Sequence, residues 1–396
     1  MKWEKVKLGD IATCIQPGPF GSQLHNSDYS KEGTPIIMPK DIVGGAIVHS
    51  GLLKVSEEHV KRLSRHQVYE GNLMVARKGD VRKCAYITAN ENGWMTGSDC
   101  LKVVLDESKC YPKFIYYQLR SEHIGRWLEK VSIGATMPSL NTGLLSGIEM
   151  VLLPIEIQKQ IAGILSVCDD LIENNQKQIK LLEEAAQRLY KEWFVDLRFP
   201  GHENTKIVDG VPEGWNEKTL SQVANVIMGQ SPKSEFYNSE KKGLPFHQGV
   251  GSYGVRFVMD DIYSTSYTRI AEPNSILFSV RAPVGRLNIT KSKVVIGRGL
   301  AAINQTDGCQ SYLYYLLKNR FFKDNIVGNG SIFASVSKDE LLNQKFLIPE
   351  RNLMMQFEKI VSQMDKQIEN LDSKNKKLIE ARDRLLPKLM SGEVEV

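Results

Sequence analysis

Two long stretches of the chain place apolar side chains at alternating spacings of four and three residues. In the first stretch, over residues 157–194, one apolar row includes Leu165 and Ile172. In the second, which follows Pro349, the matching row begins at Val361. This spacing predicts helices that each bury a narrow seam against another helix, as in a coiled coil. The first helix would be roughly 57 Å long at 1.5 Å per residue, which suits a spacer.

The two seams together predict a helix–helix interface. Each seam contains one asparagine, Asn175 or Asn375, and a buried polar residue of this kind fixes register at some loss of stability. The alternative, in which each helix packs only on its own domain, is less favoured because 38 residues exceed what one ordinary domain covers. The predicted apolar interface consists of Ile161, Leu165, Ile172, Ile179, Leu182, Leu189, Phe357, Val361, Met364, Ile368, Leu371, Leu378 and Leu385.

The chain repeats itself with a period near 200 residues. Residues 3–12 return as 215–224, in both cases an aromatic side chain, a short polar run and an amphipathic segment. Residues 71–77 return as 273–281, each a turn that leads into an apolar strand ending in arginine. The two seams are offset by 196 residues, which is a whole number of heptads. The shared register predicts an internal duplication of a head followed by a helix.

Each head mixes short β-type runs with turn signals, a pattern typical of α+β domains. If the two long helices pair antiparallel, the heads are related by a pseudo-twofold axis. Strands are predicted at 34–38, 101–105, 275–278 and 294–296, and helices near 111–130 and 311–323. The predicted boundaries are 1–154 for the first head, 155–198 for the central helix, 199–214 for a Pro- and Gly-rich linker, 215–349 for the second head and 350–396 for the C-terminal helix.

Composition excludes several classes of protein. The six cysteines form no CxxC or Cys/His spacing, so neither a zinc site nor a disulfide framework is expected, and the thiols should be reduced and mostly buried. No stretch approaches the roughly 20 apolar residues that a membrane span requires, and no apolar targeting segment follows Met1. We therefore expect a cytoplasmic protein without a metal ion.

The distribution of charge separates the heads from the helices. Residues 1–155 carry 19 Lys and Arg against 16 Asp and Glu, and residues 215–350 carry 16 against 11. The rest of the chain carries 16 against 19. Positive charge on the globular parts is expected where they meet phosphates, although an ordinary solvated surface explains charge alone about as well.

Motifs for catalysis are missing from the sequence. It contains no GxxxxGK[ST] phosphate loop, no Asn-Pro-Pro-Phe/Tyr run and no glycine fingerprint of a cofactor-dependent methyltransferase. The seven histidines are scattered, and His49 and His247 are expected to be surface or hydrogen-bonded residues. The carboxylate pair Asp169-Asp170 lies on or beside the helix seam, where solvated carboxylates are common, so no catalytic role is assigned to it.

Taken together, these features resemble the specificity (S) subunit of type I restriction-modification systems. The likeness spans essentially the whole chain, and the order of head, helix, head and helix is more specific than any one motif. The segments that carry it are 153–161 (LPIEIQKQI), 164–175, 189–196, the junction 211–215 (VPEGW) and 356–365.

The resemblance implies two target recognition domains separated by an antiparallel coiled coil, each reading one half of a bipartite double-stranded DNA sequence. It further implies that the helices hold two modification subunits, which carry S-adenosylmethionine and methylate adenine, and that ATP- and Mg-dependent restriction subunits assemble through these. The chain itself would carry no cofactor and no active site.

Candidate DNA contacts come from side-chain chemistry alone, because a guanidinium suits guanine edges and phosphates and glutamine suits adenine. Basic residues leave apolar strands into turns, and Lys40 and Gln248 follow segments taken as equivalent in the two heads. For any one of them a solvated surface role is about as expected. The candidates are Lys40, Arg77, Lys78, Arg82, Lys83, Gln248, Arg281, Arg286 and Arg298.

Two other hypotheses stay open at this point. The chain could be a coiled-coil scaffold whose heads bind protein, in which case DNA binding would lack a steep dependence on salt. It could also be a fused enzyme that acts alone, although this requires motifs that the sequence lacks.

Overall fold

The computed structural model describes residues 4–132, 138–321, 335–391 and 393–394. Contacts divide the chain into two compact units: unit 1 comprises Met1–Asn174 and Lys374–Val396, and unit 2 comprises Asn175–Ser373. Each unit therefore contains one head and one part of each long helix. Trp3, the first residue of the sequence repeat, lies outside the described residues.

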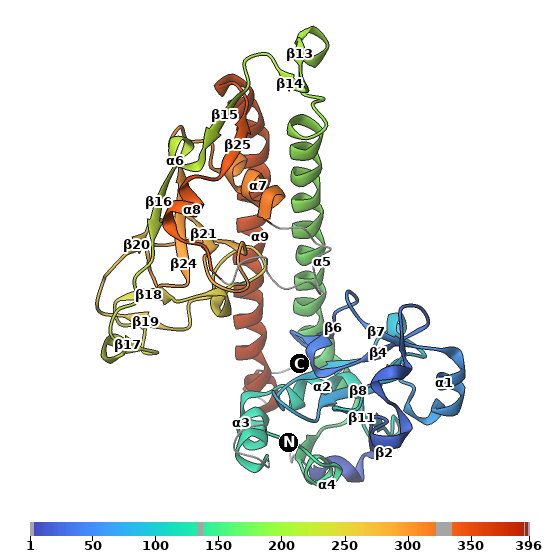
Figure 1. Cartoon of the computed structure of the whole chain (residues 1–396). Coiled ribbons are helices and arrows are strands. Elements are labelled where there is room, and N and C mark those ends of the chain that lie inside the picture. The colour runs from blue at the N-terminus through green and yellow to red at the C-terminus, as the bar shows by residue number, and fades with distance from the viewer. Residues whose placement is uncertain (1–3, 133–137, 322–334, 392, 395–396) are drawn as a thin grey trace. The chain divides into compact units, whose positions relative to one another are not determined.

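The two long helices are α5 (Ile155–Phe194) and α9 (Arg351–Ser391), drawn green and red in Figure 1. Helix α5 begins directly after Leu153-Pro154, and α9 begins one residue after Ile348-Pro349. Each begins six residues before the first predicted seam residue, Ile161 or Phe357. The first is continuous over the predicted 157–194 and starts two residues earlier. Beyond its end, Leu197 adopts a left-handed conformation with φ of 58°, which terminates the helical path.

The head of unit 1 is built from two four-stranded sheets and two strand pairs, β1 with β12 and β5 with β6. One sheet has the order β2-β11-β8-β9 and is antiparallel throughout. The other has the order β10-β4-β7-β3, in which β10 and β4 run parallel. The strands are β1 (Glu4–Lys7), β2 (Ala12–Pro17), β3 (Tyr29–Ser30), β4 (Thr34–Ile37), β5 (Ile42–Val43), β6 (Ala46–Ile47), β7 (Leu53–Val55), β8 (Leu73–Ala76), β9 (Cys84–Tyr86), β10 (Met95–Thr96), β11 (Cys100–Leu105) and β12 (Glu149–Leu152).

The head of unit 2 repeats this plan. Its antiparallel sheet has the order β16-β24-β21-β22, and its second sheet, β17-β19-β18-β23-β20, again contains one parallel pair, β18 with β23. The strands are β15 (Asn216–Thr219), β16 (Ala224–Met228), β17 (Tyr237–Asn238), β18 (Leu244–His247), β19 (Tyr263–Ser264), β20 (Ile270–Ala271), β21 (Ile276–Ser279), β22 (Leu287–Ile289), β23 (Val294–Ile296), β24 (Leu300–Gln305) and β25 (Lys345–Ile348).

The repeat is visible at the start of each head. In unit 1, β1 pairs antiparallel with β12, and in unit 2, β15 pairs antiparallel with β25. Leu8 and Leu220 follow these first strands, and both side chains are fully buried. The amide of Leu8 donates to the carbonyl of Ile148, as that of Leu220 does to Gln344. The predicted duplication thus extends to backbone hydrogen bonds.

Short helices complete the heads. The helix predicted near 111–130 is two helices, because Ser121 caps the second one by accepting from the amide of Ile124. The helix predicted near 311–323 is α7, and residues 322 and 323 lie outside the described residues. The short helices are α1 (Glu57–Arg62), α2 (Pro112–Leu119), α3 (Glu122–Val131), α4 (Thr142–Ser146), α6 (Leu220–Val223), α7 (Gln310–Phe321) and α8 (Lys338–Leu342).

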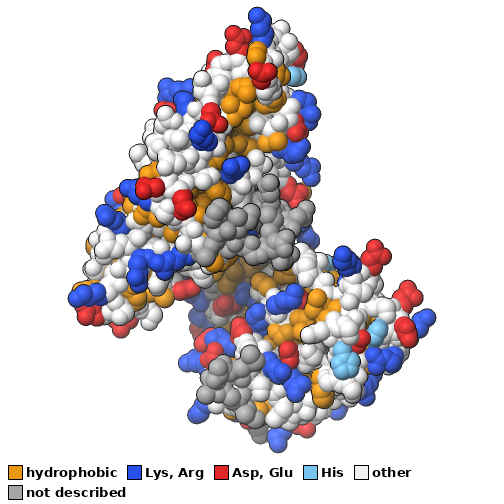
Figure 2. Space-filling view, in the orientation of Figure 1, with side chains coloured by type: hydrophobic (Ala, Val, Ile, Leu, Met, Phe, Trp, Pro, Cys, Tyr) orange, Lys and Arg blue, Asp and Glu red, His pale blue; other side chains and the backbone are white. Residues whose placement is uncertain are grey.

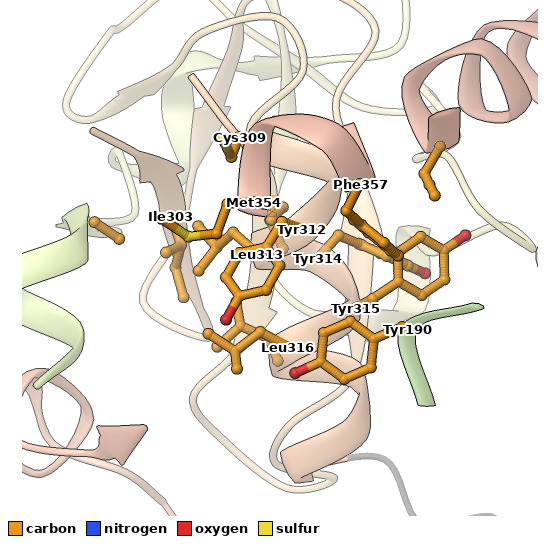
Figure 3. Packing of buried hydrophobic residues seen from close by; sticks show 14 of the residues in the cluster. Tyr190, Ile303, Cys309, Tyr312, Leu313, Tyr314, Tyr315, Leu316, Met354 and Phe357 are labelled. Atoms are coloured by element: carbon orange, nitrogen blue, oxygen red, sulfur yellow. The ribbon is translucent and has the colours of Figure 1, made fainter. Parts of the chain in front are cut away.

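The largest core of unit 2 lies where α7 meets both long helices (Figure 3). The ring of Phe357, on α9, lies 6.0 Å from that of Trp193 and 6.3 Å from that of Tyr312. Tyr190 of α5 packs on the same phenylalanine at 6.0 Å. Aromatic rings of this size bury much apolar area and prefer such edge contacts. The second head is therefore fixed to the helix parts of its own unit.

The predicted linker contains local structure. Between α5 and the second head lies a two-stranded hairpin, β13 (Ile207–Val208) with β14 (Val211–Pro212).

Four cysteines, Cys84, Cys100, Cys110 and Cys309, are buried, whereas Cys14 and Cys168 are half-buried, and all six are free thiols. No helix in the described part of the chain is long and apolar enough to cross a membrane.

Candidate nucleic-acid interface

Six of the nine candidate residues lie in the loops that leave β8 and β21; the other three, Lys40, Gln248 and Arg298, lie next to β4, β18 and β24. In unit 1, the amide of Ala76 donates to the carbonyl of Lys83, and in unit 2, that of Ser279 donates to Arg286. Both loops therefore span the same number of residues and return to the same place on the next strand. Lys83 and Arg286 occupy equivalent positions.

Strand register corrects one equivalence taken from the sequence. Arg77 and Arg281 both follow an apolar run. In unit 2, however, Arg281 forms a β-bridge with Ser335, whereas in unit 1 the equivalent bridge with Ser139 is formed by Lys78. Val280 takes the place of Arg77, since its amide donates to Gly299 at 2.9 Å as that of Arg77 does to Asp99 at 2.7 Å. The true counterpart of Arg281 is thus Lys78.

A second equivalence changes in the same way. The amide of Gly97 donates to Ile37, and that of Gly297 donates to His247, at 2.8 Å in both units. Gln248 therefore stands where unit 1 has Met38, and Lys40 is not its counterpart. Lys40 lies one turn further on, where its Nζ donates to the Gly51 carbonyl at 3.3 Å.

Three of the predicted residues of unit 2 meet around one cavity. Gln248, Arg281 and Arg298 line a hollow of about 200 Å³. We refer to it as the Arg281–Arg298 cavity; its other lining residues are Gly249, Val250, Ser279, Ala282 and Gly299. The three polar side chains are exposed, and none of them has a hydrogen bond or ion pair with another described residue.

A close backbone approach shapes this cavity. A Cβ at Gly299 would lie 2.4 Å from the carbonyl oxygen of Gln248, closer than real Cβ contacts permit. The Gly299 amide donates to that same oxygen at 3.1 Å. Glycine at 299 thus allows the loop after β18 to lie against the start of β24, which brings Gln248 beside the two arginines.

His247 holds the base of the same loop. Its side chain is fully buried, with Nδ1 2.8 Å from Ser252 Oγ and Nε2 3.1 Å from Asp260 Oδ1. These contacts fit the prediction from the sequence that His247 is a surface or hydrogen-bonded residue. Because the ring is enclosed, His247 positions the loop that carries Gln248 and does not face a ligand itself.

The basic candidates of unit 1 are mostly engaged within the unit. Lys78 Nζ lies 3.1 Å from Asp99, and Arg82 pairs with Glu122 at 2.6 Å on α3. Lys83 donates to the Pro39 carbonyl at 3.1 Å. The guanidinium of Arg77 lies 5.4 Å from the centre of the Phe20 ring. In unit 2, Arg286 also has an interaction and lines a separate hollow of about 420 Å³.

Charge alone does not mark out a binding face. Figure 2 shows Lys and Arg side chains interspersed with Asp and Glu over the visible surface of the molecule. Positional arguments are therefore needed, and contact of the candidates with DNA stays a prediction. Among the described residues, no group of three or more metal-ligating side chains lies close enough together to hold an ion.

The seam residues divide between the two units. Ile161 and Leu165 share the core of unit 1 with Leu386 and Leu389 of α9. In unit 2, Ile179, Phe357, Val361, Ile368 and Leu371 are buried in one cluster, with Leu182, Leu189 and Met364 half-buried against it. Ile172 is also buried, whereas Leu378 and Leu385 are half-buried.

Some helix residues beside the seam are more buried than their seam neighbours. Leu386 is 6% exposed although Leu385 was the predicted member, and Tyr190 is 4% exposed beside a half-buried Leu189. The reason is that each helix also packs on a head, so its buried arc is wider than a two-row seam. A heptad pattern describes contact with one partner only.

The ion pairs of two buried arginines were not predicted from the sequence, although Arg382 lies on a predicted seam row. Arg256 is 3% exposed and pairs with Asp365 of α9 at 2.6 Å and with Glu183 of α5 at 3.4 Å. Arg382, in unit 1, pairs with Asp169 at 2.7 Å. Asp169 is therefore an ion-pair partner, and not the solvated carboxylate that the sequence suggested. It also accepts a hydrogen bond from the Tyr117 hydroxyl.

Comparison with known proteins gives consistent matches. The family model of the type I restriction modification DNA specificity domain matches residues 1–184 and again 212–381. The type I restriction enzyme MjaIX specificity subunit of Methanocaldococcus jannaschii is 25% identical over 412 residues, covering 100% of this chain and 94% of that protein. A second protein of this archaeon, provisionally named as the MjaX specificity subunit, is 29% identical over 405 residues, with 100% and 94% covered.

One solved structure shares the fold. The type I restriction-modification S subunit from M. genitalium aligns with a TM-score of 0.55 at 18% identity, covering 98% of this chain and 96% of that one.

Proposed function

Because the chain belongs to the type I restriction-modification DNA specificity family, we propose that it reads a bipartite DNA target, with one head for each half-site. The observation that carries this proposal is the double match to the family model, since each match spans one set of strands and most of one long helix. The equal strand order of the antiparallel sheets in the two heads supports it, because duplicated heads offer two reading surfaces of the same design.

The proposal includes an antiparallel coiled coil of α5 and α9. In unit 1 the first turns of α5 share a core with the last turns of α9, and in unit 2 the last turns of α5 share one with the first turns of α9. Such pairing is what antiparallel helices require, and an antiparallel coiled coil would relate the heads by a pseudo-twofold axis. Two half-sites on one face of the duplex, about one helical turn apart, would suit this symmetry. Asn175 and Asn375, both buried, would fix the register.

Methyltransferase subunits are the proposed partners of the helices. The outward side of α5 in unit 1 exposes Ile164, Val167 and Leu171, which lie three and four residues apart on one helix face. Ile360 of α9 repeats Ile164 at the seam offset and is also exposed, at 42% against 41%. An exposed isoleucine at this duplicated position suits two copies of one partner, although Val167 and Leu171 correspond to Gln363 and Gln367 on α9.

The chemistry would then belong to the partners. We expect S-adenosylmethionine on the modification subunits and ATP with Mg on the restriction subunits, whereas this chain contributes the choice of sequence. The heads hold polar and basic side chains suited to binding, and the helices hold apolar and paired residues suited to assembly.

Two measurements on the full chain test the proposal. Affinity for duplex DNA should fall steeply as salt rises, because phosphate contacts release counterions. A scaffold whose heads bind protein would show no such slope. With a methyl donor, adenine methylation should require an added modification subunit. Methylation or cleavage of DNA by this chain alone would contradict the proposal and favour the fused enzyme.

A further inference from the structure

The two heads differ in charge at one set of equivalent positions. The register described above aligns Lys78 with Arg281. Cys100 pairs with Ala76 in unit 1 as Leu300 pairs with Ser279 in unit 2, so Cys100 and Leu300 are equivalent. The residues just before them are therefore equivalent too. Ser98 therefore corresponds to Arg298, and Asp99 to Gly299. With Met38 opposite Gln248, these four positions carry one cation and one anion in unit 1 but two cations in unit 2.

The difference decides whether a cation is available at this place. In unit 1, Asp99 lies 3.1 Å from Lys78 and neutralises it. In unit 2 glycine replaces the aspartate, and neither Arg281 nor Arg298 has an ion pair with another described residue. Two exposed guanidiniums that line one cavity make its rim positive, which favours a ligand with electronegative acceptor atoms.

The size and chemistry of the cavity restrict that ligand. Its volume of about 200 Å³ is below the roughly 300 Å³ at which pockets for drug-sized ligands begin. An edge of a single base fits this space better than a whole nucleotide cofactor does. Arginine presents a rigid fork of donors, which matches the O6 and N7 acceptors of guanine, while Gln248 adds an amide beside it.

We propose that the Arg281–Arg298 cavity reads a guanine edge in the half-site bound by the second head, and that the first head does not read guanine at the equivalent place. This inference rests on the proposed function. It assigns the two arginines as specificity-determining residues, with Gln248 completing the polar rim. The duplicated heads share a scaffold but differ here, which gives the two half-sites different sequences.

The test uses charge-conserving variants of the full-length chain. Wild-type protein and the Arg281→Lys and Arg298→Lys variants are each bound to a library of duplexes with randomised sequence, and bound duplexes are sequenced. Lysine keeps the charge but lacks the fork, so discrimination at guanine positions of one half-site should fall about ten- to hundred-fold. The other half-site should keep its preference, which shows that the variants are folded.

Two controls sharpen this result. Lys78→Arg, at the equivalent position of unit 1, should leave both half-sites unchanged because Asp99 still pairs with the side chain. Arg281→Ala should weaken binding as well as relax the guanine preference, because it also removes a positive charge.

Four outcomes would overturn the inference. If the lysine variants keep the wild-type motif, or if alanine weakens all duplexes equally without changing it, the arginines contact phosphate or solvent and not a base. A wild-type motif without guanine in either half would contradict the inference and leave the proposed function intact. A wild-type chain with no sequence preference at all would contradict the proposed function itself.

Discussion

At the scale of single residues, the state of His66 makes unit 1 sensitive to acid. His66 is 4% exposed, and Arg65 Nε donates to its Nε2 at 3.0 Å, which requires an unprotonated nitrogen. Burial first, and then the charge of Arg65, lowers the pKa of His66 from 6.5 to about 4. Between these values the unfolded chain binds a proton that the folded unit does not. Stability is therefore full above the unfolded pKa and falls as pH drops towards the folded one.

We predict that unit 1 loses about 2 kcal/mol of unfolding free energy between neutral pH and about pH 5 through His66. Urea unfolding at the two pH values measures the loss, with hydrogen exchange in β8 and β11 as the local readout for unit 1. His66→Gln keeps an acceptor but cannot titrate, so the difference between the two pH values should shrink. An equal pH dependence in the variant would assign the effect to other groups.

Residue types could be predicted from the sequence better than residue positions could. Arg281, Arg298 and Gln248 were chosen for their chemistry, and the structure brings them to one cavity. The register was missed because both arginines directly follow an apolar run, although β8 ends at Ala76, just before Arg77, whereas β21 ends at Ser279, two residues before Arg281. Only the strand pairing shows that Lys78 is the counterpart.

At the scale of elements, Arg256 links the second head to both long helices of its unit. Its guanidinium lies 3.8 Å from the centre of the Tyr314 ring on α7 and pairs with carboxylates of α5 and α9. Removing it would leave Asp365 and Glu183, which are 22% and 17% exposed, without their main cation. A partly buried carboxylate without a partner is unfavourable because it has lost water without gaining a counter-charge.

We predict that Arg256→Ala destabilises unit 2 by about 2–4 kcal/mol. Thermal unfolding, with hydrogen exchange in α7 and β24 as the local readout, tests this. Lys293→Ala is the matched control, because it removes an exposed pair with Glu272 in the same unit and should change stability by less than about 1 kcal/mol. Similar losses in both variants would mean that Arg256 has no special role.

Arg256 also shows why some elements could be predicted and its own environment could not. Helix α5 follows from local periodicity, and its end at Phe194 matches the predicted residue 194. The ion pairs of Arg256 join residues separated by 73 and 109 positions, and no local pattern announces such partners. The same holds for strands of two residues such as β10 and β20, which depend on their neighbours in the sheet.

At the scale of the whole molecule, the contacts divide the chain differently from the predicted order of domains. The sequence assigns 350–396 to one C-terminal helix, yet α9 contributes its first part to unit 2 and its last part to unit 1. Because the head and its helix were duplicated together, each head packs on the same kind of helix surface. The predicted boundaries of the heads are compatible with this division, but they stay a prediction.

This division has a consequence for residues at the end of the chain. Leu386 and Leu389 are 6% and 2% exposed and belong to the core of unit 1, together with Ile161 and Leu165. Shortening a buried leucine to alanine usually costs about 2–5 kcal/mol, through lost burial and the cavity that remains.

We therefore predict that the double variant Leu386→Ala/Leu389→Ala destabilises unit 1 by at least about 4 kcal/mol. Hydrogen exchange should accelerate in α2 and β11, more than 250 residues earlier in the chain, while β21 and β24 of unit 2 keep their protection. The control is Ile379→Ala, on the same helix at a position that is 39% exposed, and it should leave both units unchanged. If the double variant instead loosened the second head, which precedes these leucines directly, the stability of each head would follow the order of the chain and not the division into units.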